Sequence, residues 1–432
     1  MRSLTRRFVF FTAGAAGMYC GSCMHDNALA KAIIAEGHEC LLQPLYTPIR
    51  SDETSIASDN VFFGGIHIYA LQKMPWLSSL PRFARRWLDS PRLLRRITAG
   101  DHKTSPKALG ELTVSMMRGT DGRQADEVRR LIRWLRDEIK PDAVLYSNLL
   151  IAGSLPAIQD ALPDVRSALI LQGDDIFIEY LPEPYRQQVL DLGHNLVSRF
   201  DHTWSNSRFY ADSMADRLAI KGSSIETLPL TIDIGAYSNP PATSDESPTS
   251  FDLGFLARIA PEKGLHHLVD AFCHMGNEDE HDDLQLHVAG WLGKDHQDYL
   301  DEQLDKISAA GLSHRMTHYG SIDLNEKVRF LNRLDALCVP TDYQDPKGLF
   351  ALESMASGTP VVLPDHGAFP ELIQSTGGGL LYRSGDDAAL RQTLTRLKND
   401  PGLKRDLAET GRRAVLEKHN IQVAARHVLE SL

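Results

Sequence analysis

Two carboxylates eight positions apart, Asp345 and Glu353, enclose a stretch that could bind an anionic ligand rich in hydroxyl groups. Gly348 permits a tight loop close to a ligand, and a helix is predicted over Leu349–Ser357. The start of that helix would offer an anion site of free backbone amides, those of Gly348, Leu349 and Phe350. Because carboxylates accept hydrogen bonds from sugar hydroxyls, the pattern favours a ligand with both phosphate and hydroxyl groups. A capped turn with two solvated acids would produce the same pattern.

Two cations stand in a second loop, where a predicted strand gives way to a predicted helix. The strand ends near Leu256, the helix begins near Gly264, and Arg258 and Lys263 lie between them. Open parallel sheets bind ligands at the carboxyl ends of their strands. The two cations therefore suit a diphosphate, although a loop with Arg and Lys is commonplace on its own.

A third loop, rich in small residues, follows the first predicted strand and contains Gly14 and Gly17. Small residues let backbone amides approach a phosphate or a sugar. The spacing is not GxGxxG, so it gives dinucleotide binding only weak support. Cys20 and Cys23 follow as a CxxC, which is half of a zinc site that no second CxxC or HxxxH completes. The pair is interpreted as lining the loop near an acceptor; a redox-sensitive pair and a metal site are the alternatives.

The histidines are scattered along the chain and form no ligand cluster in the sequence. His266, His267 and His287 are expected at helix-surface or core positions. No metal site is therefore predicted.

Short apolar segments alternate with longer helical ones, which predicts βαβ units and parallel sheets. In the first half, strands are expected at Phe8–Phe11, Glu39–Leu42, Ala143–Tyr146 and Ser167–Leu171, and a helix at Asn27–Glu36. Residues 238–250 have the composition of a linker. In the second half, strands are expected at Phe251–Leu256, Leu284–Ala289, Ala336–Val339 and Pro360–Leu363.

The composition excludes several classes of protein. The 432 residues suggest two or three domains, and 42% hydrophobic residues exclude a wholly disordered chain. A net charge of −11 argues against a nucleic-acid binder, and no apolar run is long enough for a membrane-spanning helix. Five cysteines fit a reduced, cytoplasmic chain, although Arg6-Arg7 before an apolar run leaves export by a twin-arginine signal as an alternative.

Residues 72–107 form a local basic segment with interleaved aromatic residues. Nine Lys and Arg residues stand there against Asp89 and Asp101. A solvated helical face, a site for an anionic acceptor and peripheral contact with anionic lipid all fit this segment.

Taken together, these motifs resemble the retaining nucleotide-sugar glycosyltransferases of family 4, whose fold is called GT-B. The similarity extends over nearly the whole chain and is most specific at residues 254–264, 345–362 and 367–371. It implies two Rossmann-like domains that face each other across a cleft, with the C-terminal helix crossing back to the first domain. Residues 1–234, with about 415–432, would bind the acceptor, and residues 235–414 would bind the nucleotide-sugar donor.

The resemblance also implies roles for single residues. Arg258 and Lys263 would neutralise the donor diphosphate, and Gly17 would approach it from the other domain. Glu353 would hold the ribose hydroxyls, and Asp345 would lie near hydroxyls of the transferred sugar beside the helix amides. In this family the acceptor attacks from the leaving-group face and a phosphate oxygen takes its proton, so neither a protein nucleophile nor a metal is required.

Three positions depart from the family pattern. The first acid is usually Glu and is here Asp345, one methylene shorter. Lys347 replaces an aromatic or apolar residue, and would either add a cation near the donor or point to solvent. Gln172 replaces a His, and because Gln cannot titrate, no general base is assigned there. Gln172 and Asp174, with Cys20 and Cys23, remain the acceptor-side candidates.

The expected activity is transfer of a hexose, with retention, from a UDP- or GDP-linked donor to a small-molecule, glycan or lipid-linked acceptor. No cofactor and no nucleic-acid partner are expected. A sugar-nucleotide epimerase or a phosphorylase on the same fold is the alternative among enzymes. An inactive nucleotide-sugar-binding protein is the alternative among binding proteins.

Overall fold

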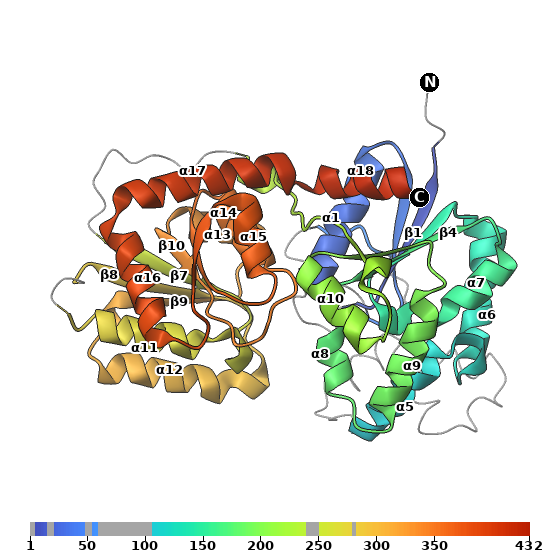
Figure 1. The fold of residues 1–432 in the computed structure, drawn as a ribbon, viewed down its shortest axis with the longest axis horizontal. Helices are drawn as coiled ribbons and strands as arrows, with labels where there is room; N and C mark the ends of the chain where they lie inside the picture. The colour runs from blue at the N-terminus through green and yellow to red at the C-terminus, as the bar shows by residue number, and fades with distance from the viewer. Residues whose placement is uncertain (1–4, 15–20, 48–53, 59–105, 239–249, 279–281) are drawn as a thin grey trace. The chain divides into compact units, whose positions relative to one another are not determined.

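The computed structural model describes residues 5–14, 21–47, 54–58, 106–238, 250–278 and 282–432. Gly17, Cys20 and all but the last two residues of the basic segment 72–107 lie outside these ranges. The chain divides into two compact units (Figure 1). The N-terminal unit comprises residues 1–228 and 425–432, and the C-terminal unit comprises residues 229–424.

The N-terminal unit is built on a parallel six-stranded sheet in the order β2-β1-β3-β4-β5-β6. The strands are β1 (Arg7–Thr12), β2 (Glu39–Pro44), β3 (Ala143–Tyr146), β4 (Arg166–Leu171), β5 (His202–Ser205) and β6 (Glu226–Thr227). Phe8 to Phe11 of β1 are fully buried. The residues of β3 are fully buried as well, apart from 1% exposure of Ala143. Strands covered on both faces read as continuous apolar runs, which is why the sequence pattern located them.

Helices surround this sheet. They are α1 (Gly21–Ala35), α5 (Pro106–Met117), α6 (Ala125–Trp134), α7 (Leu155–Ala161), α8 (Asp174–Glu179), α9 (Tyr185–Val197) and α10 (Arg208–Arg217). Short helical turns lie at Gly119–Asp121, Leu135–Ile139, Leu149–Ser154 and Gly222–Ser224. α1 begins six residues before the predicted start at Asn27, because the buried residues between Cys23 and Asn27 already pack as its first turns.

The C-terminal unit has a second parallel six-stranded sheet, in the order β12-β11-β10-β7-β8-β9. Its strands are β7 (Phe251–Leu256), β8 (Leu284–Ala289), β9 (Met316–Gly320), β10 (Ala336–Cys338), β11 (Val361–Pro364) and β12 (Gly379–Tyr382). The central strands β7 and β10 are neighbours and are almost wholly buried. The loops that leave the carboxyl ends of these two strands therefore start side by side.

The helices of this unit are α11 (Leu265–Met275), α12 (Gln297–Ala309), α13 (Leu324–Asn332), α14 (Leu349–Ala356), α15 (Phe369–Thr376), α16 (Asp387–Asn399) and α17 (Pro401–Lys418). α11 and α12 lie together on one side of the sheet, and α14 and α15 lie on the other (Figure 1). Short 3-10 turns lie at Gly235–Tyr237, Pro261–Lys263, Lys294–His296 and Ser313–Arg315. α13 begins with a capping box, in which Asp323 accepts from the amide of Glu326 and the Glu326 carboxylate accepts from the amide of Asp323.

The two segments where the chain passes between the units are joined inside the C-terminal unit. Ile232 pairs with Asn420 in a parallel bridge, flanked by hydrogen bonds from the Ile232 amide to the His419 carbonyl and from the Ile421 amide to the Ile232 carbonyl, both 2.9 Å. The imidazole Nδ1 of His419 lies 2.8 Å from the Leu230 carbonyl. The last helix, α18 (Ile421–Ser431), ends in residues that belong to the N-terminal unit, where His427 meets the edge of Trp204.

Among the helices that the structure describes, none is both long and apolar enough to cross a membrane.

Candidate functional site

Two loops of the C-terminal unit carry most of the residues that the motifs singled out. The loop after β7 contains Arg258 and the 3-10 turn Pro261–Lys263, and it leads into α11. The loop after β10 runs from Val339 to Gly348 and leads into α14. Because β7 and β10 are parallel neighbours, both loops leave the same edge of the sheet, where open α/β sheets bind ligands.

The ammonium of Lys263 and the carboxylate of Asp345 form an ion pair that joins the two loops. Nζ and Oδ2 are 2.7 Å apart, and the two side chains are 16% and 11% exposed. Oδ1 of Asp345 accepts from the backbone amides of Lys347, at 3.0 Å, and Gly348, at 3.1 Å. Asp345 thus organises its own loop and orients Lys263 at the same time.

The pKa of Asp345 reflects these partners. Burial alone would raise it, but the charge of Lys263, the hydrogen bond from its ammonium and the amide of Lys347 outweigh burial. Together they hold the pKa of Asp345 below its usual range, so the carboxylate stays ionised at neutral pH.

The first turn of α14 differs in one respect from the sequence expectation. The amide of Gly348 is engaged by Asp345, so the helix start offers the amides of Leu349 and Phe350 rather than three. Gly348 has a left-handed φ of 81°, and a Cβ there would lie 2.9 Å from the Phe369 ring. Only glycine fits this position without strain.

Gly264 closes the other loop in the same manner. Its φ is 74°, and a Cβ there would lie 1.8 Å from the carbonyl oxygen of Pro340. The absence of a side chain lets the start of α11 lie against the loop after β10. The hydroxyl of Thr341 and the amide of Asp342 both donate to the Glu262 carbonyl, at 2.7 Å and 3.2 Å, and complete this junction.

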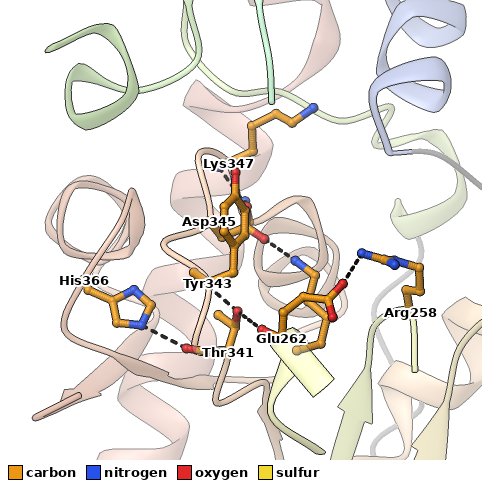
Figure 2. Close-up of polar contacts among 9 residues, drawn as sticks. Arg258, Glu262, Thr341, Tyr343, Asp345, Lys347 and His366 are labelled. Atoms are coloured by element: carbon orange, nitrogen blue, oxygen red, sulfur yellow. Dashed lines mark hydrogen bonds and ion pairs between the residues drawn. The ribbon is translucent and has the colours of Figure 1, made fainter. Parts of the chain in front are cut away.

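The other predicted cation, Arg258, pairs with a residue of its own loop (Figure 2). Its Nη2 lies 2.5 Å from Oε1 of Glu262, and about a third of each side chain is exposed. Such a partly exposed pair is weak, so the guanidinium can exchange Glu262 for a phosphate at small cost. The sequence does not indicate this pairing with Glu262.

Glu353, one turn into α14, also has a partner that the motifs did not reveal. Nζ of Lys327, from α13, lies 2.5 Å from Oε1 of Glu353, and the side chains are 8% and 15% exposed. His366, which follows β11, joins the site through Nε2, 2.9 Å from the Thr341 carbonyl (Figure 2). Its Nδ1 is buried and has no hydrogen-bond partner among the described residues.

Lys347 is buried, at 9% exposure, so the structure does not place it as a solvent-facing cation. Its side chain extends away from Asp345 (Figure 2). The interpretation that it points to solvent is therefore wrong for this residue, whereas its role toward a donor stays a prediction.

Two acceptor-side candidates, Gln172 and Asp174, meet at strand ends of the N-terminal unit. Gln172 directly follows β4, and its Nε2 donates to Oδ1 of Asp26 at 2.8 Å and to the Ser147 carbonyl at 3.2 Å. Oδ1 of Asp174 accepts from the amide of Leu149 at 2.6 Å, and Oδ2 accepts from the amide of Gln172 at 3.0 Å. Burial raises the pKa of Asp174 to about 6, and these two amides oppose the shift.

The other described acceptor-side candidate, Cys23, is buried in α1. Its Sγ lies 4.0 Å from Oγ1 of Thr12, at the end of β1. The neighbouring Ser22 donates from its hydroxyl to the Gln172 carbonyl at 3.2 Å, so the start of α1 lies against the same strand ends as Gln172.

The expectation that the histidines form no ligand cluster is wrong. His266 and His267 in the first turn of α11 come together with Asp342 from the loop after β10, with ligand atoms within 4.8 Å of one another. The sequence did not reveal the cluster because Asp342 lies 75 residues away and is brought in by the pairing of β7 with β10.

Comparison with known proteins finds similarity to glycosyltransferases. Residues 241–414 match the family model described as "Glycosyl transferases group 1". The chain is 28% identical over 209 residues to the phosphatidyl-myo-inositol mannosyltransferase of Mycobacterium leprae, covering 48% of this chain and 53% of that one. It is also 28% identical over 275 residues to the D-inositol 3-phosphate glycosyltransferase of Salinispora arenicola, covering 58% and 57%. The chain spans about half the length of these curated relatives.

Two solved structures are similar in fold to this chain over almost all of its residues. HepE of Anabaena, in complex with UDP, superposes with a TM-score of 0.66 at 16% identity, covering 98% of this chain and 99% of that one. Sucrose-phosphate synthase of Thermosynechococcus elongatus superposes with a TM-score of 0.69 at 16% identity, covering 98% of both chains. The predicted fold class, two Rossmann-like α/β domains of the GT-B type, is confirmed by these matches and by the two parallel sheets.

Proposed function

We propose that this chain, which resembles the group 1 glycosyltransferases through residues 241–414, transfers a hexose from a nucleotide diphosphate sugar with retention of anomeric configuration. The observation that carries the proposal is the junction of the two loops after β7 and β10, where Lys263 and Asp345 pair at 2.7 Å. A UDP-linked donor is favoured over a GDP-linked one, since the structural neighbour HepE is in complex with UDP. The acceptor is a small molecule, a glycan or a lipid-linked sugar.

The chemistry follows from the charge that develops when the anomeric bond breaks. The leaving diphosphate gains negative charge, and Lys263 and Arg258 stand at the strand ends where they can stabilise it. The amides of Leu349 and Phe350 add the positive end of α14. One preorganised donor of this kind lowers the barrier by about 3 kcal/mol.

The two carboxylates have different roles in this proposal. Asp345 orients Lys263 and holds the loop that borders the transferred sugar. Glu353 accepts from the ribose hydroxyls, and Lys327 fixes the position of its carboxylate. A charged carboxylate in a fixed position is a strong acceptor for hydroxyl groups.

Neither a metal nor a cofactor has a part in the transfer step. Two side-chain cations and a helix start carry the charge that a divalent ion carries in other nucleotide-sugar enzymes. Gly17 and Cys20, outside the described residues, keep their proposed roles toward the diphosphate and the acceptor. Gln172, Asp174 and Cys23 are proposed to border the acceptor from the N-terminal unit.

A nucleotide-release assay tests the proposal. The purified chain, treated with EDTA, is mixed with UDP-, GDP- or ADP-hexoses, with and without a pooled acceptor mix, and free nucleotide is measured. Release from one donor, increased by acceptor, with the product's anomeric configuration retained by NMR, is the expected result. Conversion of the sugar to an epimer without acceptor would indicate an epimerase instead, and cleavage that requires added inorganic phosphate would indicate a phosphorylase.

Matched variants locate the site. Lys263→Ala and Glu353→Ala are each expected to abolish donor use while circular dichroism shows a folded chain. Lys306→Ala and Glu302→Ala remove an exposed pair on α12 and are expected to keep full turnover. Wild-type turnover by folded Lys263→Ala and Glu353→Ala variants would refute the site. Nucleotide binding without turnover for any acceptor would indicate a binding protein.

A further inference from the structure

The first turn of α11 and the loop after β10 bring three metal-ligand side chains to one point. Nε2 of His267 lies 3.0 Å from Oδ1 of Asp342, and Nε2 of His266 lies 3.7 Å from Oδ2 of the same carboxylate. The two imidazole rings have centroids 4.0 Å apart. Tetrahedral zinc with bonds of about 2.1 Å separates its ligand atoms by about 3.4 Å. One ligand atom from each of the three side chains lies within 4.8 Å of the other two, so small rotamer adjustments would bring them to that separation.

The other nitrogen of each imidazole is held by a further side chain. Nδ1 of His266 lies 2.9 Å from the hydroxyl of Tyr299, in α12. Nδ1 of His267 lies 3.2 Å from Oδ1 of Asp387, at the start of α16. Metal-ligating histidines characteristically give their second nitrogen to such a hydroxyl or carboxylate, which fixes the ring and directs the first nitrogen at the metal. Here both rings are fixed with Nε2 toward Asp342.

The third ligand is fixed at its backbone and open to solvent at its side chain. The amide of Asp342 donates to the Glu262 carbonyl at 3.2 Å, so the backbone beneath the carboxylate is fixed. The Asp342 side chain is 56% exposed, which leaves room for a water ligand.

We propose that His266, His267 and Asp342 bind a divalent transition metal, with Zn²⁺ as the best match and water completing the coordination. Two imidazoles and one carboxylate suit zinc, cobalt and nickel, whereas magnesium and calcium prefer oxygen ligands alone. The site is separate from the proposed donor-binding side chains and does not rest on the proposed function.

Such a metal would act on the junction that carries Lys263 and Asp345. His266 lies three residues after Lys263, and Asp342 lies three residues before Asp345. A bound ion would therefore cross-link the two loops at a second point, next to the ion pair. Because it binds the folded state only, it would raise the unfolding temperature of the C-terminal unit.

Zinc titration of the untagged 432-residue chain tests the proposal. Protein freed of metal with EDTA and then dialysed is titrated with ZnCl₂ in a calorimeter, and Co²⁺ absorption reports the coordination geometry. One Zn²⁺ per chain is expected, with affinity reduced more than about tenfold in His266→Ala, His267→Ala and Asp342→Asn. Tyr299→Phe removes only the hydroxyl behind His266 and is expected to weaken binding by about 10- to 100-fold, as such second contacts do.

His274→Ala is the matched control, since His274 is an exposed histidine of the same helix, paired with Glu278. It should bind Zn²⁺ as the wild type does. Circular dichroism establishes that each variant is folded. The proposal is overturned if the folded wild type shows no saturable Zn²⁺ binding. It is overturned as well if His266→Ala and Asp342→Asn bind unchanged, or if His274→Ala loses binding equally.

Discussion

Asp345→Asn isolates the ion pair between the loops, because asparagine keeps the shape of the side chain and loses its charge. Its amide oxygen can still accept from the backbone amides of Lys347 and Gly348, which now bond to Oδ1 at 3.0 Å and 3.1 Å. What disappears is the 2.7 Å contact to Lys263. The ammonium then remains in a site where its side chain is only 16% exposed.

The expected cost is about 3 kcal/mol of unfolding free energy. Removing one partner of a buried ion pair costs about 3–5 kcal/mol, and the low end applies because both side chains keep slight exposure to water. Adding Lys263→Met to Asp345→Asn removes the unpaired ammonium and should restore part of the lost unfolding free energy. The double variant should therefore be destabilised by less than the two single variants together, by at least about 1 kcal/mol.

Urea unfolding followed by ¹⁹F NMR of fluorotryptophan-labelled protein measures this cost for the C-terminal unit. Trp291 is the one tryptophan between residues 229 and 424, so its resonance reports on the C-terminal unit. A cost below about 0.5 kcal/mol, the range of ordinary surface substitutions, would show that the pair does not hold the loops together.

The ion pair between Lys263 and Asp345 also predicts how the unfolding free energy changes with pH. Because the pKa of Asp345 is lowered in the folded state, its contribution is complete above the ordinary carboxyl pKa of about 3.9 and is lost as the pH falls through the lower folded value. The stability difference between wild type and Asp345→Asn should therefore shrink as the pH drops below about 4. A difference that stays constant down to strongly acidic pH would contradict this assignment.

Three further predictions follow from contacts in the two units. On the proposed function, Lys327→Met should weaken UDP binding about tenfold in a calorimetric titration, because Glu353 loses a partner that positions its carboxylate. Lys327→Arg should restore most of the affinity, and equal binding by Lys327→Met would exclude that role. Gly264→Ala and Gly311→Ala both place alanine at a left-handed φ, of 74° and 76°, which costs about 1–2 kcal/mol. Only Gly264→Ala also meets backbone at 1.8 Å, so its urea midpoint should fall much further, and equal midpoints would show that the loop yields freely. The Asp174 carboxyl, followed by carbon-13 NMR, should titrate with a pKa of about 6. Because burial raises this pKa in the folded state, the N-terminal unit should lose stability as the pH rises from about 4 to 6. A titration midpoint below 4 would show that water reaches the carboxylate.

Much of the fold could be predicted because buried parallel strands appear in the sequence as short runs of apolar residues. The strand predicted at Phe251–Leu256 has those bounds, and the one predicted at Phe8–Phe11 extends by one residue at each end. The start of a helix is harder to predict from the apolar pattern, as α1 shows. Its first turns contain Cys23, His25 and Asp26, which the apolar pattern does not count as helical although all three are buried.

The site could be predicted at the level of loops but not of partners. The rule that ligands bind at strand ends located the loops with Arg258 and Lys263, since it needs only the order of strands and loops. The partner of Lys263 lies 82 residues away and that of Glu353 lies 26 residues away. No local pattern encodes these pairs, because they depend on which strands become neighbours. The cluster of His266, His267 and Asp342 was missed for the same reason.

The N-terminal unit is made of two separate segments of the chain, and this affects the order of folding during synthesis. Residues 425–432 complete that unit, yet the ribosome makes them after the whole of the C-terminal unit. Domains commonly fold in the order in which they emerge, from the N-terminus onward. Here the second unit, continuous from 229 to 424, can close first, while the first waits for the helix that brings His427 to Trp204. The buried side chains of Ala425 and Val428 would be the last pieces of its core to arrive.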